Sequence, residues 1–469
     1  MGPTLYSARV GDMIPNRPPP LPDDDQAEDA QAAEAEGYEP PVEGLDLSMS
    51  FDADVPTGMT ALIGADVISM RDASGGRIDD ATILLDGNRI TAIGPVDTID
   101  IPADARRVDV SGKVIIPGLI DAHAHGPYGD DEIIPQQNWS AIAHLALGVT
   151  TIHDPSSDAS HVFPTGELQR AGLQLAPRTY STAEVVYGAQ SPGIYAEIDS
   201  LEDAEEHIGR LAAQGAHSIK NYNQPRRDQR QQVVTAAQEA GLPVFAEGSS
   251  LFHMDMALIA DGNTGIEHNL PQMMIYEDVL SFFSQTGVGY TPTLVVTYGG
   301  LAADPYWRQA TDVWRHPILS RHVPPDQLLP RSVRVQTAPE EDFVDDDNAR
   351  VAKMLADRGV YVSIGGHGQE EGLAAHWELW SFVRGGMSPL EALRAGTIVP
   401  ARHLGFDRDL GSLEPGKLAD LIVLDADPMI DIRNSDDISY VMQNGRLYDP
   451  VTMNEVVTGD GETEPYFWQ

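Results

Sequence analysis

VIIPGLIDAHAHG, residues 114–126, marks the point at which the pattern of this sequence changes. Downstream of it, short apolar segments alternate with amphipathic helical stretches such as 203–215 and 230–241, a rhythm typical of parallel βα units. The eight candidate strands are GLIDAHAHG, GVTTIHDPS, PRTYSTAEV, AHSIKNY, LPVFAEG, NTGIEHN, VGYTPTLVV and VYVSIGG. Eight such units predict an α/β fold with a closed (β/α)8 TIM-like barrel, whose chemistry lies at the C-terminal ends of the strands.

The sequence on both sides of this region reads as β-sheet. Before it, TALIGADVISM and TILLDGNRITAIGP alternate in polarity, and Asp86-Gly87-Asn88 predicts a hairpin turn. After it, strand-like text returns, with Asn444-Gly445 as a second hairpin turn. We therefore predict that residues 58–116 and 408–469 form one composite β-sandwich, into which a barrel of residues 117–407 is inserted.

The first 57 residues differ from the rest of the chain. They contain the proline run Pro18 to Pro20, the acidic run Asp23 to Asp25 and an Ala/Glu/Asp tract with few large apolar side chains. Such a composition buries too little apolar surface to order itself. We expect residues 1–57 to be a partly disordered acidic lead or the remnant of an upstream domain.

Charge and composition restrict the partners of this chain. Its 469 residues carry 30 basic and 72 acidic side chains, a formal net charge of −42. This charge repels nucleic acid and anionic membranes, and no apolar run is long enough to cross a bilayer. We expect a soluble protein that binds a small-molecule substrate, with homo-oligomerisation left open. Only four lysines occur, which suggests a salt-adapted, halophilic surface.

The start of the chain shows no basic segment followed by an apolar one, so no secretory signal is visible. A cytoplasmic location is the default expectation, and export of a longer parent chain stays open. The chain contains no cysteine, which excludes disulfides and thiolate chemistry. Any metal must therefore be bound by histidine and carboxylate side chains.

His123 and His125 end the first candidate strand. Because alternate strand residues point to the same face, the two-residue spacing places both imidazoles together, where two ring nitrogens can bind one ion. Such pairs also occur as ordinary polar residues at the rim of a barrel. The interpretation as a metal site therefore depends on the other strand ends.

The stretch VIIPGLIDAHAHG, together with MSPLEALRAGTIVPARHLGFDRDLGSLEPGKLADLIVLDADP downstream, resembles the amidohydrolase superfamily, in particular its imidazolonepropionase-like and dipeptidase-like branch. The resemblance extends from about Ala61 to Asp449. IIPQQNW, NQPRRDQRQQ and GLAAHWELW are similar to the C-terminal hydrolase part of chains in which a TolB-like propeller precedes such a hydrolase. This likeness implies that the acidic lead replaces or truncates a propeller.

The resemblance implies a metal site built from the strand-1 histidine pair, a strand-4 lysine that is often carboxylated, histidines on strands 5 and 6, and a strand-8 aspartate. This sequence departs from that pattern twice, with Glu247 on strand 5 and His367 on strand 8. A carboxylate and an imidazole have thus exchanged strands, and both can bind divalent ions. The implied ligands are His123, His125, Lys220, Glu247, His268 and His367.

The expected cofactor is one or two divalent ions, with Zn²⁺ favoured, and Lys220 is a candidate for carboxylation. Zinc lowers the pKa of a bound water to about 7, so a weak base suffices to deliver hydroxide. His367 could be that base, or it could be a ligand while Glu247 is the base. Alternatively, Lys220 and Glu247 form an ion pair that leaves one ion or none.

Further candidates lie at other strand ends. Asp154 is a candidate to orient a ligand histidine, or simply to cap the turn before Pro155. Substrate contacts are expected from Tyr187, Asn221, Tyr222 and Tyr298, although such residues also serve in ordinary packing. Glu370, Glu371 and His376 follow strand 8, where they could contact a basic or polar group of the substrate, but in so acidic a chain we favour a solvated acidic loop.

Together these features predict an amidohydrolase that cleaves an amide-like, non-standard peptide or cyclic amide bond through metal-activated water. Because both departures concern the region of the base, ester or lactone hydrolysis and deamination remain alternatives. A different class of function is a non-catalytic scaffold with an amidohydrolase-like fold. The histidines at strands 1 and 6 and Lys220 weigh against that class.

Overall fold

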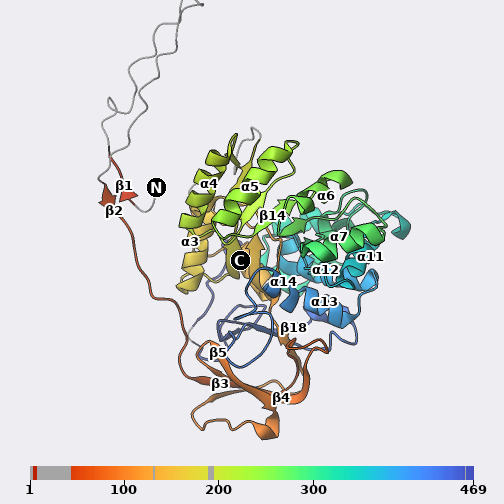
Figure 1. Ribbon diagram of the computed structural model, residues 1–469. Helices are drawn as coiled ribbons and strands as arrows, with labels where there is room; N and C mark the ends of the chain where they lie inside the picture. Colours follow the sequence, from red (N-terminus) through yellow and green to blue (C-terminus); the bar gives the residue numbers. More distant parts are fainter. Residues whose placement is uncertain (1–3, 8–43, 130–132, 189–194, 460) are drawn as a thin grey trace, which may run out of the picture. The chain divides into compact units, whose positions relative to one another are not determined.

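Two compact units make up the chain, Met1–Asp52 and Ala53–Gln469. The computed structural model describes residues 4–7, 44–129, 133–188, 195–459 and 461–469 (Figure 1). In the first unit, β1 (Thr4–Leu5) and β2 (Leu45–Asp46) pair antiparallel. Most of the predicted acidic lead, residues 8–43, lies outside the described residues.

The second unit is a mixed α/β structure, and one of its sheets joins the two ends of the unit. This sheet has eight strands in the order β19-β18-β17-β7-β3-β4-β5, with β6 paired to β3. The strands are β3 (Met59–Ile68), β4 (Arg77–Asp86), β5 (Arg89–Pro95), β6 (Arg106–Asp109), β7 (Val114–Pro117), β17 (Leu421–Leu424), β18 (Ile438–Gln443) and β19 (Arg446–Tyr448). The antiparallel pair β7–β17 joins sequence from before and after the βα region, with Ile116 opposite Ile422.

Both predicted hairpins are present in this sheet. Asp86 pairs with Arg89 across the turn at Gly87 and Asn88, and Gln443 pairs with Arg446 across Asn444 and Gly445. Gly87, Asn444 and Gly445 have φ values of 58°, 53° and 76°. Tight two-residue hairpin turns require such left-handed backbone, which glycine and asparagine adopt at low cost.

Parallel strands form two further sheets. The first has the order β10-β9-β8, and the second has the order β12-β11-β13-β14-β15-β16. Their bounds are β8 (Leu119–Asp121), β9 (Val149–Asp154), β10 (Arg178–Ser181), β11 (Val185–Tyr187), β12 (Tyr195–Glu197), β13 (Ile219–Asn221), β14 (Val244–Glu247), β15 (Gly265–Glu267) and β16 (Gly289–Thr291). Every pairing within these two sheets is parallel.

Two predicted strands were wrong in detail. PRTYSTAEV is not one strand but two, β10 and β11, because the chain turns at Ala183, where φ is 54°. VYVSIGG forms only an isolated parallel bridge between Val362 and Tyr290. Backbone hydrogen bonds still connect this segment to both of its neighbours, from Ser363 N to Tyr290 O (3.0 Å) and from Ala122 N to Ile364 O (3.1 Å).

Helices follow most of the parallel strands. They are α2 (Trp139–Ala146), α3 (Ala159–Arg170), α4 (Leu201–Gln214), α5 (Arg227–Glu239), α6 (Phe252–Ala260), α7 (Glu277–Thr286), α8 (Ala303–Ala310), α9 (Pro317–His322), α10 (Pro325–Ser332), α11 (Asp345–Ala356), α12 (Leu373–Arg384), α13 (Pro389–Ala395) and α14 (Ile398–His403). In Figure 1, α4 and α5 lie at the opposite end of this unit from β3 and β4. Among the residues described, no helix is both long and apolar enough to span a bilayer.

Helix α4 shows how local sequence produces these elements. Ser200 and Asp203 form a capping box at its start, and Gly215 ends it with φ at 106°. Ala204, Ile208 and Leu211 are buried, a spacing that places all three on one face of a helix. The helix therefore begins, ends and packs where the sequence predicts.

Candidate metal centre

Two histidines at the end of β8 face each other. His123 Nε2 lies 3.2 Å from His125 Nε2. The other nitrogen of each ring contacts a carboxylate: His123 Nδ1 lies 2.7 Å from Glu267 Oε2, and His125 Nδ1 lies 2.9 Å from Asp154 Oδ1. When Nδ1 donates its proton to a carboxylate, Nε2 presents a lone pair. Two lone pairs at this distance repel each other unless a cation lies beside them.

Two more imidazoles from other parts of the fold join this pair. Ring nitrogens of His123, His268 and His367 all lie within 4.8 Å of one another. His268 directly follows β15, and His367 follows the segment bridged to β16. The His367 ring is also 4.8 Å from the His125 ring, centroid to centroid. We call these four residues, His123, His125, His268 and His367, the imidazole cluster.

The backbone at the cluster is unusual for histidine. His268 and His367 have φ values of 67° and 58°, in the left-handed region that costs energy for residues other than glycine. His367 N also donates a hydrogen bond to the carbonyl oxygen of His123 at 2.6 Å. This bond joins the two segments that contain His123 and His367, whose rings approach a common point.

Glu247, at the end of β14, lies beside the cluster. Its Oε2 is 2.6 Å from Lys220 Nζ on β13, and its Oε1 is 3.0 Å from His268 Nε2. The Tyr298 hydroxyl approaches Oε1 at 3.5 Å. Lys220 is 1% exposed, and a buried ammonium requires a compensating charge. The Lys220–Glu247 ion pair, which was one of the predicted alternatives, supplies it.

Burial and charge set the protonation of these groups. Burial lowers the pKa of His367 to about 3, and the neighbouring His125 and His268 act in the same direction. Burial also lowers the pKa of His123 well below its usual value. Burial would raise the pKa of Glu247, but Lys220 and His268 together outweigh it and lower that pKa. At neutral pH, His123 and His367 are therefore neutral bases next to an ionised carboxylate.

Comparisons with known proteins bear on the family and the fold of the chain. The model of the amidohydrolase family matches residues 224–453. An imidazolonepropionase of Symbiobacterium thermophilum is 24% identical over 391 residues, covering 75% of this chain and 86% of that protein. A 5-methylthioadenosine/S-adenosylhomocysteine deaminase of the same organism is 23% identical over 412 residues, covering 74% and 81%. The crystal structure of a Xaa-Pro dipeptidase with bound methionine superposes with a TM-score of 0.63 at 18% identity, covering 84% of this chain and 100% of that one.

Residues 224–453 of the chain form a domain that matches the amidohydrolase family. The relatives of the chain support the imidazolonepropionase-like and dipeptidase-like branch that the sequence motifs indicated. An amidohydrolase is a hydrolase acting on carbon–nitrogen bonds, so this is the class of enzyme to which the chain is assigned.

The donor set of this amidohydrolase fits a divalent cation. Imidazole nitrogens suit borderline ions such as Zn²⁺, and the Asp154 carboxylate behind His125 favours the tautomer of that ring whose Nε2 carries a free lone pair. Asp154, which the sequence offered as an orienting residue, is the partner of His125. Its other oxygen, Oδ2, is buried without a hydrogen-bond partner among the described residues.

Two important carboxyl groups were missed by the sequence reasoning. Glu267, which contacts His123, is fully buried, and burial raises its pKa to about 8. Glu378 on α12 accepts a hydrogen bond from Val295 N at 2.8 Å, and burial raises its pKa to about 8 as well. A signal for Glu267 existed, because it immediately precedes His268 in the motif Ile-Glu-His. Glu378 lies within GLAAHWELW, a stretch already quoted for its resemblance to relatives, but nothing in that stretch distinguished the glutamate as a functional residue.

The predicted substrate residues separate into two groups in the amidohydrolase structure. Tyr187 and Tyr222 pack edge to face at 5.1 Å between ring centroids, and Tyr195 joins them. Tyr298 lies against His268, with ring centroids 5.3 Å apart. Asn221 instead is fully buried, and its amide donates hydrogen bonds to Arg230 O and Asn263 Oδ1. The tyrosines lie next to the cluster or to one another, whereas the Asn221 side chain is engaged in the interior.

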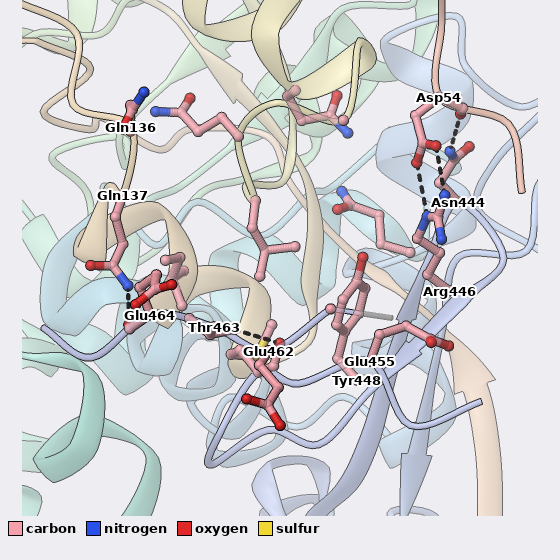
Figure 2. Close-up of a pocket in the computed structure, with 18 of the residues that line it drawn as sticks. Asp54, Gln136, Gln137, Asn444, Arg446, Tyr448, Glu455, Glu462, Thr463 and Glu464 are labelled. Atoms are coloured by element: carbon pink, nitrogen blue, oxygen red, sulfur yellow. Dashed lines mark hydrogen bonds and ion pairs between the residues drawn. The ribbon is translucent and has the colours of Figure 1, made fainter. Parts of the chain in front are cut away.

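A separate cleft of about 810 Å³ lies elsewhere in the amidohydrolase. Figure 2 shows it between residues near the N-terminal side of α2, such as Gln137, and the hairpin strand β19 with Arg446 and Tyr448. Asp54 forms an ion pair with Arg446 at its edge. None of the described residues that line this cleft belongs to the imidazole cluster. The volume of the cleft is therefore unrelated to the chemistry of that cluster.

Proposed function

We propose that this protein is a metal-dependent hydrolase that cleaves an amide-like, non-standard peptide or cyclic amide bond in a small substrate. The observation that carries the proposal is the convergence of imidazoles from three separate segments on one point. The match to the amidohydrolase family supports the reaction class. The position of the cluster at the C-terminal ends of parallel strands matches where barrel enzymes place their chemistry.

The fold we propose for this function is the predicted closed barrel inserted in a composite sandwich, with boundaries at 58–116, 117–407 and 408–469. Hydrogen bonds that bridge the two parallel sheets support closure. They run from His217 N to Ser181 O (3.0 Å) on one side and through Ile364 to Ala122 on the other. The shared sheet that contains β7 and β17 supports the composite domain.

We assign the cation, with Zn²⁺ favoured, to His123, His268 and His367, with His125 as the adjacent fourth donor. When bound, such an ion polarises the scissile carbonyl and lowers the pKa of a water molecule. This choice makes His367 a ligand rather than the base. The position of its ring supports the choice, because a ring nitrogen of His367 lies within 4.8 Å of those of His123 and His268.

Glu247 is our candidate for handling the proton. Its carboxylate lies 3.0 Å from His268 and within reach of the Tyr298 hydroxyl. Lys220 keeps this carboxylate ionised between proton transfers. The same ion pair favours an unmodified Lys220 over the carboxylated form, because a carbamate would place two anions in contact. Labelling with ¹³C-bicarbonate followed by carbon NMR tests this point, and a carbamate signal that disappears in Lys220→Met would contradict it.

The substrate we propose is a small amide, such as a dipeptide, an N-acyl amino acid or a cyclic amide. The relatives named imidazolonepropionase and Xaa-Pro dipeptidase support a compact amide. Tyr187, Tyr222 and Tyr298 are the proposed contacts for its side groups. Deamination is the second candidate, since one relative is named as a deaminase, and ester or lactone hydrolysis is the third.

A substrate panel tests the proposal. Dipeptides, N-acyl amino acids, cyclic amides, lactones and aminated nucleosides are incubated with protein dialysed against chelator and then reloaded with Zn²⁺. We expect new amine and carboxylate products from an amide only in the reloaded sample. Release of free ammonia from a nucleoside would instead favour deamination. Failure to bind any divalent ion with an intact fold would favour the non-catalytic scaffold.

A further inference from the structure

The turn that carries His367 has a strained backbone. His367, Gly368, Glu370, Glu371 and Gly372 have φ values of 58°, 74°, 44°, 39° and 96°. Three of these five residues are not glycine, and left-handed backbone at such residues persists only where surrounding contacts impose it. The question is therefore which contacts hold residues 367–372 in place.

On one side, the turn is pressed against β8 and the residues that follow it. His367 N bonds to His123 O at 2.6 Å. A Cβ atom at Gly368 would lie 1.9 Å from the carbonyl oxygen of His125, so no other residue fits there. The turn thus contacts both histidines of the β8 pair through its backbone. A shift of the turn would displace His367 relative to them.

On the other side, two arginines bind the two glutamates of the turn. Arg308 of α8 forms an ion pair with Glu370. Arg331 of α10 binds both carboxylate oxygens of Glu371, with Nη1 3.0 Å from Oε1, and its Nε lies 3.5 Å from Glu370. Arg308 also donates to the carbonyl oxygen of Arg331 at 2.8 Å. We call Arg308, Arg331, Glu370 and Glu371 the arginine clamp.

The two glutamates of the clamp are buried, contrary to the expectation of a solvated acidic loop. Glu370 and Glu371 are 1% and 6% exposed. A buried carboxylate without a partner is costly, and each of the two glutamates has an arginine partner that offsets this cost. A bidentate arginine–carboxylate contact fixes the relative orientation of the guanidinium and the carboxylate as well as the distance between them. The clamp therefore has the charge and the geometry to impose the strained turn.

We propose that Arg308 and Arg331 are positioning residues for His367, acting through Glu370 and Glu371. This inference rests on the proposed metal site for its functional meaning, but its structural part is independent of metal. The helical segment 303–332 contains both arginines and lies between β16 and α11. In this arrangement, a segment remote from the strand ends sets the geometry of a strand-end ligand.

Two measurements test the proposal on Arg308→Met, Arg331→Met and Arg331→Lys. The first is hydrogen exchange of the peptide covering residues 365–373 in metal-free protein. The second is the affinity for Co²⁺ together with its visible absorption spectrum, which reports the coordination geometry. The matched control is Arg315→Met, because Arg315 also pairs with an acid, Asp312, but both side chains are 64% exposed.

We expect exchange in 365–373 to accelerate at least about tenfold in both methionine variants. Co²⁺ binding should weaken by about 10–100-fold, the usual loss when a group that orients a ligand is removed, and the Co²⁺ spectrum should change. Arg331→Lys retains the charge but not the bidentate contact, and should fall between wild type and Arg331→Met. Arg315→Met should match wild type within twofold.

Unchanged exchange, with Co²⁺ affinity within twofold of wild type, in folded methionine variants overturns the proposal. Should the methionine variants fail to fold, Glu371→Gln, which keeps the shape of the side chain, provides the same two readouts. If wild type binds no Co²⁺ while exchange still accelerates in the variants, the clamp stands and the proposed metal function fails. The two inferences therefore fail in different ways.

Discussion

His268 connects two parts of the candidate metal centre. His268 contributes a nitrogen to the imidazole group and also contacts Glu247. It therefore connects the proposed ligands to the proposed proton carrier. Its backbone is left-handed, with φ at 67°, which is a strained conformation for histidine. This conformation directs the ring toward the cluster.

Replacing His268 by alanine should abolish stable metal binding. We expect affinity for Zn²⁺ to fall by more than about 100-fold, because even residues that only orient a ligand contribute about 10–100-fold. Metal content after dialysis, measured by atomic emission, checks this. The control is His253→Ala, since His253 is exposed on α6. Equal metal content in the two variants would contradict the assignment of His268 as a ligand.

Glu378 makes a prediction about pH. Its pKa is raised from 4.5 to about 8 by burial, so the folded protein binds a proton that the unfolded chain releases above about pH 4.5. The free energy of unfolding therefore falls as pH rises from about 4.5 to 8, and this contribution is complete below that window and lost above it. Glu378→Gln removes this slope.

Relative to wild type, the free energy of unfolding of Glu378→Gln should rise by more than about 1.4 kcal/mol between pH 5 and pH 8, the equivalent of one pKa unit. Urea unfolding of metal-free protein at each pH measures this gain. Glu205→Gln, at an exposed position on α4, should show parallel pH profiles with wild type. Parallel profiles for Glu378→Gln as well would show that this carboxyl is ionised throughout.

Local signals explain which elements were predictable. Parallel strands are short apolar runs between helices, so β8, β9, β13, β14 and β15 could be located from the sequence, and their last residues with them. His123, His268 and His367, predicted from strand ends and family resemblance, meet in the structure. A repeating pattern of this kind is visible without knowledge of the fold.

Other features depend on tertiary contacts and left no local pattern. The break at Ala183 and the turn at 367–372 depend on left-handed residues that are not glycine, which sequence preferences disfavour. Glu370 and Glu371 pair with arginines that lie about 40 to 60 residues away in the sequence. Burial of such acids is decided by partners that a local pattern does not reveal.

The pairing of β7 with β17 in the eight-stranded sheet leads to a prediction about stability. Ile115 of β7 is fully buried opposite Val423 of β17, in a core that also contains Leu421 and Met442. Ile115→Ala should lower the free energy of unfolding by about 2–4 kcal/mol through lost burial and a cavity. Chemical denaturation measures this change. Ile430→Ala, at a site that is 83% exposed, should change stability by less than about 0.5 kcal/mol.

The net charge of the chain affects the stability of the protein as a whole. A net charge of −42 makes self-repulsion a general destabilising term, which salt screens. We expect Tm to rise by several degrees in NaCl, mostly below about 0.3 M, where the screening length falls from about 30 Å to under 10 Å. Thermal unfolding followed by circular dichroism tests this. A Tm that is flat or falls between low and molar salt would remove the case for salt adaptation.

The pairing of β7 with β17 has a consequence for biosynthesis. β7 leaves the ribosome early and pairs on one side with β3, but its other edge has no partner until residues 421–424 have been translated. An unpaired strand edge recruits other strands, so the nascent chain passes through a long interval in which it is prone to aggregate. Premature termination anywhere in the intervening region would release a polypeptide with that edge permanently open.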